Sequence, residues 1–146
     1  MSLLDQVTSD TKDAMRAGDR ERVGALRLIV DSLQKAHKEA TGDPADEVAV
    51  LQRERKRRVE AAEAYRDAER TDLAEAEERE AAIIETYMPQ QLSDEDLRAI
   101  VGDVVAESGA SSPKEMGKVM SAVMPQVKGR ADGKRVSAIV QEVLRP

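Results

Sequence analysis

Apolar residues recur every three or four positions along nearly the whole chain, and this helical spacing is the strongest constraint on its fold. The 146 residues include two Tyr but no Phe and no Trp. The core is therefore built from Leu, Ile, Val, Met and Ala, which favours packed helices over a sheet. The first stripe illustrates the pattern with Leu3, Leu4, Val7, Thr11, Ala14 and Met15. We expect an all-α protein.

Capping and turn residues divide the pattern into seven predicted helices. Glycine is expected just after a helix, and Ser or Asp just before one. The expected landmarks, in chain order, are Gly18 after the first helix, Asp19 before the second, Gly42-Asp43-Pro44 after the second, residues 47–68 as the third, residues 73–87 as the fourth, Ser93 before the fifth, Ser112-Pro113 at the start of the sixth, and Asp132 before the seventh.

The pair Met88-Pro89 is the clearest internal boundary, because proline disfavours helix at the residue before it. It separates two parts with different expected architectures. Residues 1–88 are predicted to form an N-terminal helical-hairpin bundle. Residues 89–146 are predicted to form a small three-helix tail domain.

Composition excludes several classes of function. The chain has no cysteine, so disulfides, thiolate zinc sites and cysteine nucleophiles are excluded. It has no run of about 18 apolar residues, so no membrane span is expected. The N-terminal sequence MSLLDQVTSDTKDAM carries acids and no apolar signal segment, which predicts a cytoplasmic protein.

Charge is unevenly distributed along the chain. The net charge of −6 argues against indiscriminate nucleic-acid binding, and we expect no DNA partner. From residue 113 to residue 146, however, seven basic residues face only three acidic ones. A basic tail on an acidic body indicates an anionic partner for the tail.

The segment MPQVKGRADGKR, residues 124–135, is the main candidate for chemistry. A phosphate loop needs GxxxxGK followed by Ser or Thr, after a strand. Here Gly129 and Gly133 are one residue too close, Arg135 replaces the hydroxyl residue, and the context is helical. Nucleotide hydrolysis is therefore not supported. The residues leave two alternatives open, a solvated interhelical turn or an anion site at a helix start.

Other polar motifs indicate structure rather than catalysis. The basic run at residues 53–58 is expected to pair with the acidic fourth helix. A membrane-surface helix is disfavoured because Trp and Phe anchors are missing. His37 is the single histidine and is expected to be packed or partly exposed, without the partners that a metal site or a catalytic relay needs. We predict no catalytic residue, no metal and no cofactor.

Three motifs together carry a family resemblance. The segment YMPQQLS at residues 87–93, MGKVM at 116–120 and KGRADGK at 128–134 resemble, in order and spacing, motifs of the GatB/YqeY family. The whole chain resembles a stand-alone YqeY-type protein. It is also similar to the C-terminal helical and tail region of the B subunit of the glutamine-dependent aspartyl/glutamyl-tRNA amidotransferase.

The resemblance implies an all-helical fold with a smaller tail, and a tail that helps to hold tRNA. It also implies the family label of carbon–nitrogen ligase activity with glutamine as amido-N-donor, although no residue here is expected to perform that reaction. We therefore expect a non-catalytic tRNA-binding or amidotransferase-associated module. Carried over by motif position, the RNA-facing residues are Lys118, Lys128, Gly129, Arg130, Gly133, Lys134 and Arg135.

The expected partners are tRNA and an amidotransferase or aminoacyl-tRNA synthetase complex, with no membrane partner. Contacts are expected to read phosphate and shape, because the tail has no aromatic side chain on which a base could stack. The alternative is a protein-interaction adaptor that docks on a translation or aminoacylation complex through its acidic helical body, without RNA contact.

Overall fold

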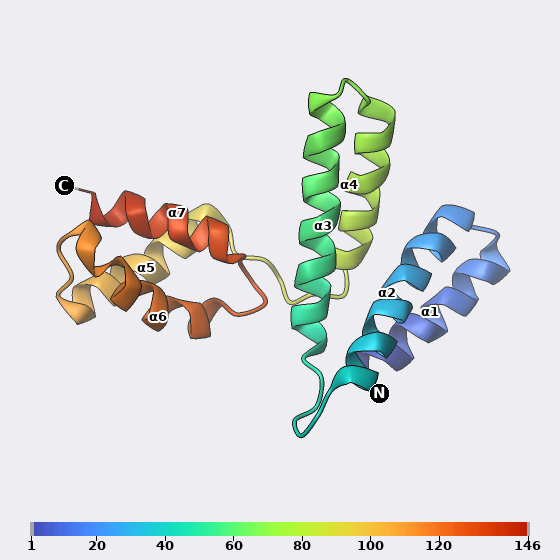
Figure 1. The fold of residues 1–146 in the computed structure, drawn as a ribbon, viewed down its shortest axis with the longest axis horizontal. Helices are drawn as coiled ribbons and strands as arrows, with labels where there is room; N and C mark the ends of the chain where they lie inside the picture. Colours follow the sequence, from blue (N-terminus) through green and yellow to red (C-terminus); the bar gives the residue numbers. More distant parts are fainter. Residues whose placement is uncertain (1, 146) are drawn as a thin grey trace. The chain divides into compact units, whose positions relative to one another are not determined.

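The computed structural model describes residues 2–145. In this part of the chain all regular secondary structure is helical, which confirms the predicted all-α class. The chain separates into two compact units, Met1–Met88 and Pro89–Pro146 (Figure 1). Each unit has its own apolar core.

The N-terminal unit consists of two helical hairpins (Figure 1). Two predicted helix ends are confirmed, because Gly18 ends the first helix at φ 72° and Asp19 caps the second. Ser2, which was not predicted as a cap, forms a capping box with Asp5. A left-handed φ is accessible to glycine without steric cost. The helices are α1 (Leu3–Ala17), α2 (Arg20–Glu39), α3 (Glu47–Asp67) and α4 (Thr71–Glu85).

A single apolar cluster holds the two hairpins together. It draws on all four helices, with Val7, Leu26, Leu33, Leu51 and Ile84 among its members. After α4 the chain remains attached to this unit, because the Tyr87 hydroxyl donates a 2.6 Å hydrogen bond to Asp10 Oδ2. Burial and this bond to a carboxylate raise the pKa of Tyr87, so the phenol stays protonated.

Ion pairs connect α3 to α4 along their length, as the charge pattern predicted. Arg66 lies 2.7 Å from Glu78, and Arg55 pairs with Glu85. Arg58 lies 3.5 Å from Glu77 and 3.4 Å from Glu80. The basic run that begins at residue 53 is thus partly neutralised by the acidic helix beside it.

The C-terminal unit is a three-helix bundle around valine-rich faces, with Leu97, Val119 and Val140 fully buried. Met116, Met120 and Met124 are partly buried against this core, as their spacing predicted. The helices are α5 (Asp94–Ser108), α6 (Met116–Val127) and α7 (Gly133–Leu144).

The start of the sixth helix differs from the prediction. Residues Pro113–Glu115 form a 3-10 turn, η1, and the α-helix begins only at Met116. The Glu115 carboxylate folds back to accept from the backbone N–H groups of Ser111 and Ser112. This capping box tightens the first turn, and a 3-10 start is a frequent way to satisfy the free N–H groups of a helix.

Candidate nucleic-acid interface

A tight turn joins α6 to α7 and carries most of the predicted RNA-facing residues. Gly129 is buried and adopts φ 80°, the left-handed conformation expected of it. Arg130 N–H then donates to Val127 O at 2.8 Å, and Ala131 is buried in the core. Asp132 caps α7 by accepting from Arg135 N at 2.8 Å. Apolar anchors on both sides therefore fix the turn to the bundle.

The two glycines of the turn are predicted to respond differently to alanine. Gly129→Ala places a Cβ at a positive φ and is expected to destabilise the C-terminal unit by about 1–2 kcal/mol. Gly133→Ala is the matched control, because a Cβ there would meet nothing within 4 Å. Removing glycine flexibility at a compatible site is expected to leave stability unchanged or raise it by up to ~1 kcal/mol. Urea unfolding of both variants tests this, and equal destabilisation would contradict it.

The turn also contacts the connector, residues 89–93, which precedes α5. Leu92 N donates to Arg130 O at 2.9 Å, and Gln91 Nε2 donates to Gly129 O at 2.9 Å. Arg130 Nε returns a hydrogen bond to Gln90 O at 3.2 Å. Leu92 is buried in the core of this unit, so the contact has an apolar anchor as well. The YMPQQLS and KGRADGK motifs, about 40 residues apart in sequence, are therefore hydrogen-bonded to each other.

Arg135 is the most constrained residue of the predicted set. Its guanidinium is half-buried, and Nη2 donates both to Leu92 O and to Asp94 Oδ1, each at 2.8 Å. The hydrogen bond and charge of Arg135 hold the pKa of Asp94 below its ordinary value, so Asp94 is a carboxylate at neutral pH. Sequence inspection did not single out Asp94 or Gln91, because their roles depend on which groups the fold brings within reach.

The remaining predicted residues differ in position. Lys128 and Lys134 are exposed on either side of the turn, and Gly133 begins α7. Lys118 is exposed in the first turn of α6, where Nζ donates to Ser108 O at 3.3 Å. The length of α6 separates it from Lys128 by roughly 15 Å. The fold thus gathers six of the seven residues and leaves Lys118 at the opposite end of α6.

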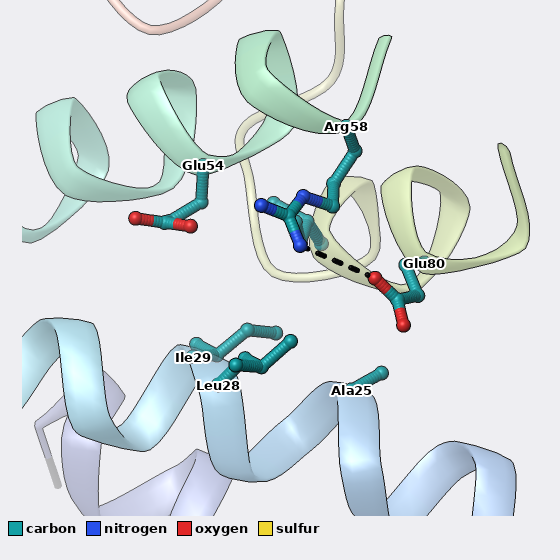
Figure 2. Close-up of a pocket in the computed structure, with 7 residues that line it drawn as sticks. Ala25, Leu28, Ile29, Glu54, Arg58 and Glu80 are labelled. Carbon is teal, nitrogen blue, oxygen red and sulfur yellow. Dashed lines mark hydrogen bonds and ion pairs between the residues drawn. The ribbon is translucent and has the colours of Figure 1, made fainter. Parts of the chain in front are cut away.

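In the N-terminal unit, a notch between α2, α3 and α4 is lined by apolar side chains of α2 and by charged side chains of α3 and α4 (Figure 2). Ala25, Leu28 and Ile29 of α2 face Glu54 and Arg58 of α3, with Glu80 of α4 beside them. Its volume of about 10 Å³ has room for a single water molecule. The notch is therefore too small for a substrate.

The described residues also lack the side-chain clusters that a metal site needs. No group of three or more His, Asp or Glu within residues 2–145 is arranged to hold a metal ion. His37 is exposed on α2, with Nε2 at 3.2 Å from Glu47 Oε2. No helix in the described part of the chain is long and apolar enough to cross a membrane.

Comparisons with known proteins give consistent matches. The model of a family described as Yqey-like protein matches residues 4–144. Altered inheritance of mitochondria protein 41, mitochondrial, of Pyrenophora tritici-repentis is 27% identical over 147 residues, covering 97% of this chain and 81% of that protein. An uncharacterized protein of Schizosaccharomyces pombe is 31% identical over 84 residues, covering 56% of this chain and 68% of that protein.

Proposed function

This chain belongs to the YqeY-like family, and from that premise we propose that its C-terminal unit binds folded tRNA without catalysing a reaction on it. One observation carries the proposal. The exposed side chains of Lys128, Arg130 and Lys134 lie around the start of α7, on a turn that the connector and the core hold in place. The resemblance of this turn to the tail of the amidotransferase B subunit points to tRNA as the anion.

The binding chemistry follows from the helix start. The first N–H groups of α7 have no partner within the helix, and Asp132 takes only that of Arg135. The N–H groups of Gly133 and Lys134 can therefore donate to a phosphate, assisted by the positive end of the helix dipole. The tail has no aromatic residue, so contacts read backbone phosphate and shape. Binding of this kind is modest in affinity and sensitive to salt.

We propose further that the bound tRNA is presented to an amidotransferase or an aminoacyl-tRNA synthetase complex, as the family resemblance implies. The cytoplasm is our proposal for the compartment of this step, and the Pyrenophora relative is named as mitochondrial.

Replacing the two exposed lysines of the turn tests the proposal. Lys128→Gln/Lys134→Gln is expected to weaken binding of unfractionated, folded tRNA roughly tenfold at moderate salt. The slope of log affinity against log salt should fall by about one for each lysine removed. Filter binding across a salt series gives both quantities.

A matched control removes two exposed lysines from the N-terminal unit, Lys12→Gln/Lys35→Gln. An equal loss of affinity in the control would show that net charge, not the turn, governs binding. Absence of tRNA binding by the unmodified protein would refute the proposal. Protein partners that survive nuclease treatment in a pull-down, with no RNA bound, would instead support the adaptor alternative.

A further inference from the structure

Groups of the protein already accept the Arg135 hydrogen bonds that a phosphate would need. An arginine holds a phosphate bidentately through either the Nε–Nη2 edge or the Nη1–Nη2 edge, and each edge uses one hydrogen of Nη2. In Arg135 both Nη2 contacts are made within the protein, to Leu92 O and to Asp94 Oδ1, each at 2.8 Å. A bidentate phosphate contact therefore requires one of these bonds to break.

Arg130 provides an informative contrast. Its contact with the connector runs through Nε to Gln90 O at 3.2 Å. That bond engages the Nε–Nη2 edge and leaves the Nη1–Nη2 edge to meet a phosphate. Arg130 can thus bind an anion bidentately without giving up a contact, whereas Arg135 must first release one of its two Nη2 partners.

We propose that Asp94 is a built-in competitor that occupies Arg135 in the RNA-free protein and that a tRNA phosphate displaces. This inference rests on the proposed RNA-binding function and adds a regulatory contact to the same site. A carboxylate and a phosphate present similar pairs of oxygens to a guanidinium, so Asp94 imitates the ligand. The contact lowers affinity for weak anions and reserves Arg135 for a phosphate that other residues already hold nearby.

The two partners of Nη2 differ in how readily they can leave. The Asp94 side chain is 62% exposed, and ion pairs in such a position contribute little net stability. Once displaced, Asp94 returns to water in the first turn of α5, where the helix dipole still favours a negative charge. Leu92, in contrast, is buried and also donates its N–H to Arg130 O. Asp94 is therefore the exchangeable partner, and the connector stays in place.

Asp94→Asn tests the competition directly. Asparagine keeps the shape but is a weaker, neutral acceptor, so a phosphate displaces it more easily. We expect affinity for unfractionated, folded tRNA to rise roughly three- to tenfold. Its dependence on salt should also become steeper, because one phosphate contact is added. The charge-matched control is Glu95→Gln, in the same first turn of α5 and exposed, which should produce a smaller gain.

Dependence on Arg135 completes the test. In an Arg135→Lys background the gain from Asp94→Asn should vanish, because lysine has no bidentate edge to liberate. If Asp94→Asn lowers the melting temperature, Asp94→Ser gives a second variant with the same expected gain. Equal affinities of Asp94→Asn and Glu95→Gln would overturn this inference and leave the proposed function intact. Failure of the unmodified protein and of Asp94→Asn to bind tRNA would overturn both.

Discussion

Leu97→Ala is expected to unfold the C-terminal unit while the N-terminal unit stays folded. Leu97, on α5, is fully buried and belongs to the apolar core of the C-terminal unit. Loss of a buried leucine side chain costs about 2–5 kcal/mol, from lost burial and the cavity left behind. A unit of roughly 60 residues supplies only ~3–5 kcal/mol of stability, so the substitution removes most of it.

Two-dimensional amide NMR of the full chain measures this result unit by unit. Signals from residues 89–146 should collapse to unfolded positions, and those from residues 1–88 should remain dispersed. The tRNA binding proposed for the tail should disappear with them. Leu28→Ala is the control of the same chemical type, because Leu28 is 46% exposed in the N-terminal unit. A folded tail in Leu97→Ala would contradict the core assignment.

Arg58→Ala is expected to destabilise the N-terminal unit by about 2–3 kcal/mol, below the range for a fully buried pair because the site is partly hydrated. Arg58 is 23% exposed and lies between Glu77 and Glu80 of α4, with Glu54 on the same side of the notch (Figure 2). Without the guanidinium, Glu77 and Glu80, which are neighbours on α4, lose the α3 cation that lies 3.5 Å from the first and 3.4 Å from the second. Repulsion and incomplete hydration then act together.

Urea unfolding of the N-terminal unit measures the effect. Lys56→Ala is the matched control on the same helix, since Lys56 is 64% exposed and lies 4.0 Å from Glu60. Its removal is expected to change stability by less than about 0.5 kcal/mol. Equal losses for the two variants would show that Arg58 acts only through surface charge.

Several features of the fold were predictable from short stretches of sequence. Gly18 and Gly129 each lie just after an apolar helical stripe, and both adopt the positive φ expected there. Ser93 and Asp132 each accept from a backbone N–H three residues later, as their positions predicted. Such contacts span a few residues, so residue type and spacing suffice to predict them.

The pairing of α3 with α4 was predictable for a related reason. Consecutive helices joined by a short turn lie antiparallel, so a basic helix followed by an acidic one pairs along its length. The sequence pattern did not predict, however, which arginines of the third helix face α4. Arg55 and Arg58 pair with acids of α4, whereas Arg53 and Arg57 line a separate groove between α2 and α3.

The sequence alone determined the helical class, several of the helix caps and the location of basic residues in the tail. Only the tertiary structure decided what those basic residues do. Arg130 and Arg135 look alike as charges, and each contacts a connector residue about 40 positions away. Arg130 nevertheless keeps one guanidinium edge for a phosphate, whereas both Nη2 contacts of Arg135 are made within the protein. Charge is a property of the residue type, whereas the direction and partner of a hydrogen bond depend on which groups folding brings within 3 Å or so of one another.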